Sequence, residues 1–120
     1  MYSMMIVDDS NIMRRKIERI QQGTQFNIVG TANNGKQAVQ MFEQLYPDVI
    51  TMDLTMPEQD GINTIPIIRQ LSSSVRILVV SALSDKATAI KALQKGAQGF
   101  VCKPFTDIEL QDALCELVED

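Results

Sequence analysis

The sequence contains no histidine and only two cysteines among its 120 residues. The lack of histidine excludes zinc fingers of the Cys-His type, catalytic triads that use histidine, and His-ligated metal sites. The two cysteines, Cys102 and Cys115, lack the CxxC spacing of metal and redox motifs. We expect both to be reduced thiols of an intracellular protein.

The sequence also lacks a dense run of lysine and arginine, and its formal net charge is −4. Nucleic acids and anionic membranes are bound through a basic surface, so neither is an expected direct partner. The one basic cluster, Arg14-Arg15-Lys16, is short and lies in a helical pattern, which predicts a solvated helix face. No signal peptide or membrane span is apparent, since Met4-Met5-Ile6-Val7 runs directly into two aspartates. We expect a cytoplasmic protein.

The chain shows no linker, internal repeat or low-complexity segment. Its hydrophobic fraction of 45% and charged fraction of 22% are ordinary for a soluble globular protein. A chain of this length buries most of its apolar surface without disulfides or metals. We therefore expect residues 1–120 to form a single domain.

Short apolar runs alternate with longer amphipathic ones, a pattern typical of βαβ units and a parallel sheet. The expected strands are 3–7, 26–32, 48–52, 75–80 and 99–102. The expected helices begin after Ser10 or Asn11, near Gly35, near Asn63 or Thr64, at Asp85, and after Thr106 or Asp107. The fold class is α/β, a (βα)5 arrangement with one five-stranded doubly wound sheet.

Three local signals shape these expectations. Gly23 and Gly96 are predicted to cap the first and fourth helices. Pro66 falls inside the apolar pattern of the third helix, and because proline is tolerated mainly in a first turn, we expect that helix to begin late. The fourth helix has a sparse apolar stripe, Ala87, Ile90 and Leu93.

Four of the five expected strands end in chemically notable groups: Asp8-Asp9, Asp53, Ser81 and Lys103. In a parallel sheet these ends lie along one edge, where open α/β folds place their sites. Crowded carboxylates repel unless a divalent cation or an ammonium group lies between them. Oxygen ligands without His or Cys select a hard ion, Mg²⁺ or Mn²⁺. Carboxylates, a hard cation, a lysine and a hydroxyl together suit a transferring phosphoryl group.

These segments resemble the receiver domain of response regulators in two-component signalling, and the likeness covers the full length. It is carried by Ile6-Val7-Asp8-Asp9-Ser10, Asp53-Leu54-Thr55-Met56-Pro57 through Asp60-Gly61, Val80-Ser81-Ala82, and Lys103-Pro104-Phe105. The order and spacing of all four segments make the resemblance specific. It implies the flavodoxin-like, CheY-like fold with strand order 2-1-3-4-5.

The resemblance also implies residue roles. Asp53 resembles the phosphoacceptor, and Asp9 and Asp53 resemble the direct Mg²⁺ ligands. The backbone carbonyl of Thr55 would be a third ligand, and Asp8 would bind the metal through water. Lys103 resembles the lysine that pairs with the carboxylate and then with the phosphoryl oxygens, through a cis bond to Pro104. Ser81 matches the switching hydroxyl, and Phe100 matches the switch aromatic.

The function implied is a phosphorylation-activated signalling switch. A histidine kinase or phosphotransfer protein would phosphorylate Asp53, and the face made by the fourth helix, fifth strand and fifth helix would then regulate a protein target. The same face can pair two receivers in a phosphorylation-dependent homodimer. The chain would be no enzyme beyond its own phosphoryl transfer and autodephosphorylation. Leu83, two residues beyond Ser81, cannot orient a hydrolytic water, which predicts slow dephosphorylation.

Other interpretations remain open at this point. The chain could be the receiver part of a longer response regulator, or a pseudo-receiver that only binds partners. A Mg²⁺-dependent phosphohydrolase would need a second carboxylate two residues after Asp53, where Thr55 stands. A flavin or nucleotide binder would need a Gly- or Ser/Thr-rich phosphate loop after the first strand, where two aspartates stand.

Overall fold

Strands and helices alternate along the whole chain in the computed structural model, which describes residues 1–54, 56, 61–83 and 85–119. The strands are β1 (Tyr2–Val7), β2 (Phe26–Ala32), β3 (Val49–Met52), β4 (Arg76–Ser81) and β5 (Gly99–Cys102). The helices are α1 (Asn11–Ile20), α2 (Gly35–Leu45), α3 (Gly61–Leu71), α4 (Lys86–Lys95) and α5 (Asp107–Val118). Among the described helices, none combines the length and the apolar character that crossing a membrane requires.

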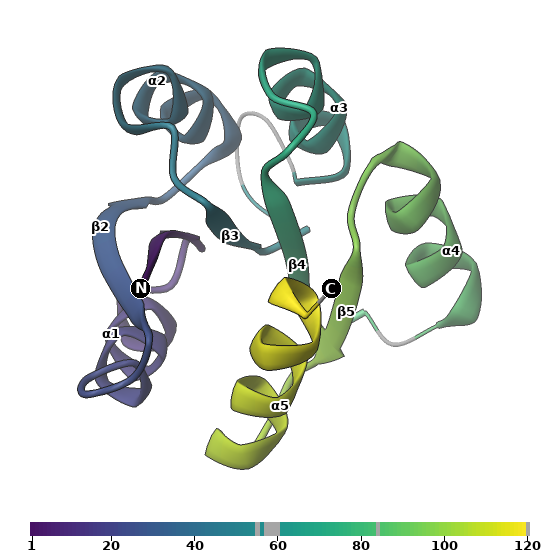
Figure 1. The fold of residues 1–120 in the computed structure, drawn as a ribbon. Coiled ribbons are helices and arrows are strands. Elements are labelled where there is room, and N and C mark those ends of the chain that lie inside the picture. Colours follow the sequence, from purple (N-terminus) through teal and green to yellow (C-terminus); the bar gives the residue numbers. More distant parts are fainter. Residues whose placement is uncertain (55, 57–60, 84, 120) are drawn as a thin grey trace.

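The strands form one parallel sheet in the order β2-β1-β3-β4-β5, which confirms the predicted fold class and strand order. Helices α1 and α5 lie on one side of the sheet, and α2, α3 and α4 lie on the other (Figure 1). Because every pair of neighbouring strands is parallel, all five carboxyl ends lie at the same edge. The loops that leave this edge carry the residues predicted to act.

The sheet separates two hydrophobic cores. Met5, Ile50 and Met52 point into the core shared with α2 and α3, whereas Met4 and Val49 point into the core shared with α1 and α5. All four residues of β3 are buried, as the unbroken apolar run predicts for a central parallel strand. Burial of each large apolar side chain contributes about 1.5–3 kcal/mol. The central strand is therefore held firmly from both faces.

Side-chain caps fix the starts of α1, α2, α4 and α5. Ser10 accepts a hydrogen bond from the Met13 N–H at the start of α1, and Thr106 forms a capping box with Glu109 at the start of α5. Asp85 caps α4, and the hydrogen bonds from the Thr88 side chain and backbone hold its pKa below the ordinary value. These caps satisfy backbone N–H groups that have no partner inside the helix.

Two predicted helix boundaries were wrong. Helix α1 ends at Ile20 with Gln21 as its cap, and Gly23, with a φ of 79°, lies in the turn that follows. Helix α3 begins at Gly61, two residues before Asn63, and it contains Pro66 in its interior and not in its first turn. Proline there removes only one backbone hydrogen bond, and the complete burial of the neighbouring Ile65 and Ile68 outweighs that loss.

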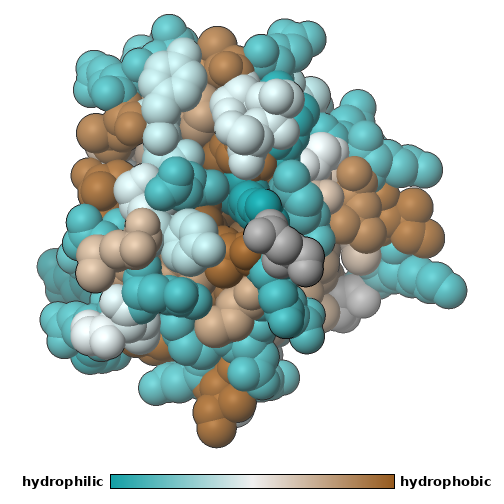
Figure 2. Space-filling view, in the orientation of Figure 1, coloured by the Kyte–Doolittle hydropathy of each residue, from teal (hydrophilic) through white to brown (hydrophobic). Residues whose placement is uncertain are grey.

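The sparse apolar stripe of α4 faces outward. Ile90 and Leu93 are 44% and 46% exposed, and Ala87 is exposed as well. Ala92 is the one described residue of α4 that is buried. The stripe therefore lies on the outer side of α4, and hydrophobic residues gather over α4 on the molecular surface (Figure 2). Such an exposed apolar group marks a candidate contact surface.

The carboxyl end of α4 is fastened by Arg69 of α3. One guanidinium nitrogen of Arg69 donates to the Gly96 carbonyl at 2.7 Å, and the other donates to the Val75 carbonyl at 2.7 Å. Gly96, which ends α4 as predicted, has a φ of 127°, a conformation that side chains disfavour. Charge-assisted hydrogen bonds are stronger than neutral ones, so this end of α4 is held more firmly than its sparse packing suggests.

The core contains one polar atom whose replacement should stabilise the fold. Thr51 of β3 is buried, and its hydroxyl oxygen has no hydrogen-bond partner among the described residues. A buried hydroxyl without a partner costs about 1–3 kcal/mol. We expect Thr51→Val to raise the free energy of unfolding by about 1 kcal/mol, measured by urea denaturation.

The matched control is Thr106→Val, which removes a hydroxyl that does accept a hydrogen bond, from the Glu109 N–H at 3.1 Å. That variant should lower the free energy of unfolding by about 1 kcal/mol. A Thr51→Val protein no more stable than wild type would contradict the prediction.

Candidate functional site

Backbone hydrogen bonds continue beyond the strand ends and fix the residues that follow them. The Asp8 N–H donates to the Ala32 carbonyl at 3.0 Å, and the Asp53 N–H donates to the Val7 carbonyl at 2.9 Å. The N–H of Lys103 donates to the Ser81 carbonyl at 2.8 Å. The backbone of the residues predicted at the strand ends is therefore held by hydrogen bonds that extend the sheet.

Three carboxylates converge at this edge. One oxygen from each of Asp8, Asp9 and Asp53 lies within 4.8 Å of the others. Asp8 and Asp53 are only 1% and 5% exposed, whereas Asp9 is exposed. Like charges at such distances, largely removed from water, repel strongly. The cluster therefore needs a positive charge close by.

Lys103 supplies that charge. Its ammonium nitrogen lies 2.7 Å from Asp8 Oδ2 and 3.8 Å from Asp53 Oδ1. Its short contact is a charge-assisted hydrogen bond with Asp8, and the longer one is an ion pair with Asp53. The peptide bond between Lys103 and Pro104 is cis, as the family resemblance predicts. Lysine and the two buried carboxylates thus form one charged group.

The hydrogen bonds of Asp8 separate its role from that of Asp9. Asp8 Oδ1 accepts from the Ser10 N–H at 2.9 Å, and Asp8 Oδ2 accepts from Lys103. Both oxygens of Asp8 are therefore engaged by the protein itself. Asp9 presents its carboxylate to solvent beside them. This arrangement agrees with the predicted roles of Asp9 as a direct ligand and Asp8 as an indirect one.

The donor set fits a hard divalent cation. All three clustered groups offer carboxylate oxygens, which Mg²⁺ and Mn²⁺ prefer, and the exposed Asp9 leaves the cluster open to solvent on one side. Mg²⁺ is commonly held by one or two carboxylates and keeps several waters, which such an open site allows. The predicted third ligand, the carbonyl of Thr55, lies outside the described residues.

Ser81 and Phe100 lie on the adjoining strands. Ser81 is buried at the end of β4, and its hydroxyl oxygen accepts from the Leu83 N–H at 3.0 Å. Phe100 of β5 is partly buried against the core shared with α2 and α3. Its strand partner Val79 belongs to the same core, and Ser81 lies two residues beyond Val79, so Ser81 and Phe100 share one face of the sheet. Their switching roles remain predictions.

Gly61 explains how α3 can begin directly beside the site. A Cβ atom at this position would collide with the carbonyl oxygen of Asp53, and it would also lie 2.9 Å from the Leu54 Cα. The Gly61 N–H donates to the Leu54 carbonyl at 3.0 Å. Only glycine permits this close approach of two backbones. The start of α3 is thereby joined to the segment that carries Asp53.

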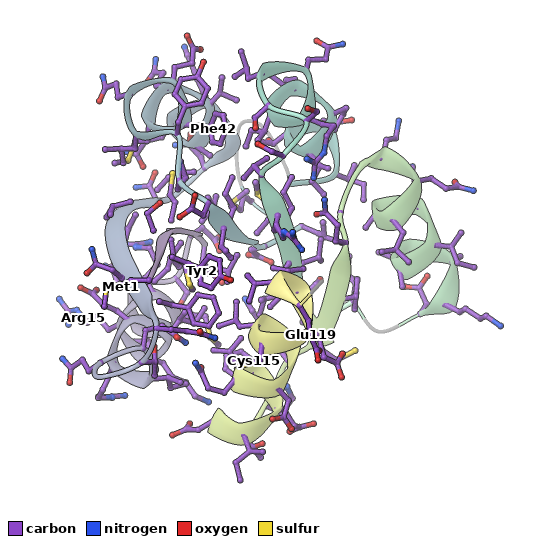
Figure 3. All side chains as sticks on the ribbon, viewed as in Figure 1. Met1, Tyr2, Arg15, Phe42, Cys115 and Glu119 are labelled. Carbon is purple, nitrogen blue, oxygen red and sulfur yellow. The ribbon has the colours of Figure 1, made fainter. Side chains whose placement is uncertain are left out.

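The basic cluster of α1 corrects one sequence-based interpretation. Arg14 is half-buried and its Nη1 donates to the Asp8 carbonyl at 2.6 Å. Lys16 donates to the Phe105 carbonyl at 3.2 Å, and its ammonium lies 4.7 Å from the centre of the Phe105 ring. Only Arg15 is the solvated residue expected, and it projects from α1 away from the sheet (Figure 3). The i, i+1, i+2 spacing that suggested a single face places these residues on different sides of the helix.

Comparison with known proteins agrees with this geometry. The model of the response regulator receiver domain family matches residues 4–115. The chain is 39% identical over 113 residues to the chemotaxis protein CheY of Bacillus subtilis, an alignment that covers 94% of both chains. It is 40% identical over 109 residues to a protein-glutamate methylesterase/protein-glutamine glutaminase of Syntrophomonas wolfei, covering 88% of this chain and 31% of that protein.

A solved structure shows the same likeness. A chain of the CheX–CheY–BeF3–Mg²⁺ complex from Borrelia burgdorferi is 30% identical and superimposes with a TM-score of 0.96, covering 99% of this chain and 90% of that one. The family match spans nearly all of the sequence, and the strand order and charged edge are those that the family resemblance implied. The chain belongs to the response regulator receiver domains of two-component signalling and is CheY-like.

Proposed function

We propose that this protein is a signalling switch that accepts a phosphoryl group on Asp53 from the phosphohistidine of a histidine kinase or phosphotransfer protein. The observation that carries the proposal is the grouping of Asp53 with two further carboxylates and the Lys103 ammonium at the carboxyl edge of the sheet. A nucleophilic carboxylate next to a fixed cation is the arrangement that phosphoryl transfer requires.

In the transfer step, a carboxylate oxygen of Asp53 attacks phosphorus. The phosphorus–nitrogen bond of the donor breaks, and the imidazole leaves with the electron pair of that bond. Lys103 already lies 3.8 Å from Asp53 and is positioned to pair with the phosphoryl oxygens once the carboxylate has become an acyl phosphate. Asp9 and Asp53 would hold a Mg²⁺ ion, which would supply positive charge next to the phosphoryl oxygens. Beyond its own phosphoryl transfer and autodephosphorylation, the protein turns over no separate substrate.

The change in target binding would be transmitted through β4 and β5. The hydroxyl of Ser81 is one residue from the β4–α4 loop, and the phosphoryl group draws it inward as a hydrogen-bond donor. Phe100 on the same face of the sheet moves with it, and the surface formed by α4, β5 and α5 changes its affinity for a protein target or a second receiver. The exposed Ile90 and Leu93 give this surface its apolar contact residues. Phosphorylation thereby biases a pre-existing equilibrium between two states.

One relative favours a second arrangement for the domain. In the Syntrophomonas wolfei protein, the matching region makes up 31% of the chain. The same receiver unit can therefore be one part of a longer regulator, with the same chemistry on Asp53 and an output that acts on an attached domain.

The first test is phosphorylation by a small acyl phosphate or phosphoramidate with Mg²⁺, followed by intact mass. We expect wild type to gain about 80 Da, and Asp53→Asn to gain nothing, because the nucleophile is removed. The control is Asp48→Asn at the other end of β3, where the carboxylate instead binds Ser3, and it should gain the same mass as wild type. A folded wild type that takes no phosphoryl group in Mg²⁺ would favour a pseudo-receiver.

The second test is stabilisation by Mg²⁺. A ligand that binds only the folded state at ten times its dissociation constant adds about 1.4 kcal/mol to the free energy of unfolding. We expect this increase in wild type and not in Asp9→Asn, measured by urea denaturation with and without MgCl2. The control Asp112→Asn removes an exposed carboxylate of α5 and should keep the full increase. An undiminished increase in Asp9→Asn would exclude Asp9 as a ligand.

The third test concerns the lifetime of the phosphorylated state. Leu83 is 44% exposed and lies next to Ser81, with an apolar side chain that cannot orient water. We expect Leu83→Glu to accelerate acyl-phosphate decay by about tenfold or more, since a carboxylate there can position a hydrolytic water. Leu93→Glu adds the same charge on the outer side of α4 and should leave the decay rate unchanged. Equal decay in Leu83→Glu and wild type would refute this role of Leu83.

A further inference from the structure

We infer that Arg14 is a positioning residue for the metal-binding carboxylate Asp9, an inference that rests on the function proposed above. Arg14 Nη1 donates to the Asp8 carbonyl at 2.6 Å, and Nη2 donates to Asn11 Oδ1. Among the ion pairs between described residues, Arg14 takes part in none. Its guanidinium instead binds the backbone of the loop between β1 and α1.

The bond from Arg14 reaches the peptide group that joins Asp8 to Asp9. The carbonyl of Asp8 and the N–H of Asp9 belong to the same planar unit, so holding one fixes the orientation of the other. Asp8 is also held from its side chain, by Lys103 and by the Ser10 N–H. The peptide between the two aspartates is thus clamped from both sides.

The position of the Asp9 carboxylate depends on these hydrogen bonds, because its own side chain makes none with the described residues. Its carboxylate is exposed and makes no hydrogen bond with the part of the chain that the structure describes. Only the backbone therefore aims it toward Asp53. If the Asp8–Asp9 peptide rotates, the carboxylate leaves the cluster, and one ligand of the cation is lost. Groups that orient metal ligands in this way are typically worth about 10–100-fold in affinity.

The two hydrogen bonds of residue 14 explain why arginine suits this position better than lysine. Two separate acceptors, one backbone carbonyl and one side-chain amide oxygen, are bound by two nitrogens of a single planar group. A guanidinium holds both donors in a fixed relation, whereas an ammonium group is a single point. Arg14 can accordingly fix the orientation of the Asp8–Asp9 peptide group, and a lysine at the same position would fix it less well.

The sign of the effect distinguishes positioning from simple electrostatics. A positive charge near a cation site opposes binding of the cation, so deleting it for electrostatic reasons alone should tighten Mg²⁺ binding. Loss of positioning should instead weaken it. Arg15, the adjacent residue, has the same charge, is exposed, and makes no hydrogen bond to the loop among the described residues, so Arg15→Gln reports the electrostatic effect by itself.

The experiment compares wild type, Arg14→Gln, Arg14→Lys and Arg15→Gln by calorimetric Mg²⁺ titration and by hydrogen exchange of residues 9–11 in metal-free protein. We expect Arg14→Gln to weaken Mg²⁺ binding about tenfold and to accelerate exchange in the loop. Arg15→Gln should bind as tightly as wild type or more tightly, with unchanged exchange. Arg14→Lys, which keeps the charge and most of the stem, should lie between Arg14→Gln and wild type.

Mg²⁺ binding and loop exchange like those of wild type in Arg14→Gln would overturn the inference and leave the proposed function intact. If Arg14→Gln fails to fold, Arg14→Lys decides, and wild-type affinity in that variant would overturn the inference. A wild type that binds no Mg²⁺ would overturn both the inference and the metal dependence of the proposed function. The two failures are therefore distinguishable.

Discussion

The contact between the Lys103 ammonium and the Asp8 carboxylate is the interaction on which the charged edge of the sheet depends. Without it, two nearly buried carboxylates and a third close by would face one another with no described cation among them. Removing one partner of a buried pair typically costs 3–5 kcal/mol, because the other charge stays in a poorly solvated place. This contact therefore places a positive charge beside Asp8, and the same ammonium group lies 3.8 Å from the buried Asp53 carboxylate.

That contact joins residues 95 positions apart, and only the parallel sheet makes it possible. β1 and β5 are not neighbours, since β3 and β4 lie between them. The right-handed crossovers of a doubly wound sheet bring every carboxyl end to one edge, and the ladder hydrogen bonds that extend to Asp8, Asp53 and Lys103 hold these residues in register. The strands thus fix the positions of Asp8, Asp53 and Lys103, and the loop after β1 adds the exposed carboxylate of Asp9.

The strands and the charged edge of the sheet could be predicted from the sequence. Apolar runs indicate the strands, and in a parallel sheet the carboxyl ends of all strands lie at the same edge. The start of α3, the direction of the α4 stripe and the environment of Arg14 depend on tertiary contacts and could not be predicted. Pro66 looked like a helix start because the burial of Ile65 and Ile68 cannot be weighed from sequence. The direction in which the stripe of α4 faces could not be predicted, because an outer apolar face has the same period as an inner one. Arg14 looked solvated because its acceptor, the Asp8 carbonyl, has no sequence signature.

The attachment of α4 has a mechanical consequence. The helix is fastened at Gly96 by the Arg69 guanidinium, while along its length Ala92 is its one described buried residue. Burial of a methyl-sized group such as the Ala92 side chain contributes only about 0.8 kcal/mol. Reversing an equilibrium between two conformations from 1:99 to 99:1 takes about 5.5 kcal/mol, so the burial of Ala92 is a small barrier to moving α4. We expect a helix that is attached mainly at one end to tilt about that end. In such a tilt the end of α4 nearest Ser81 would be displaced most, and the end at Gly96 least.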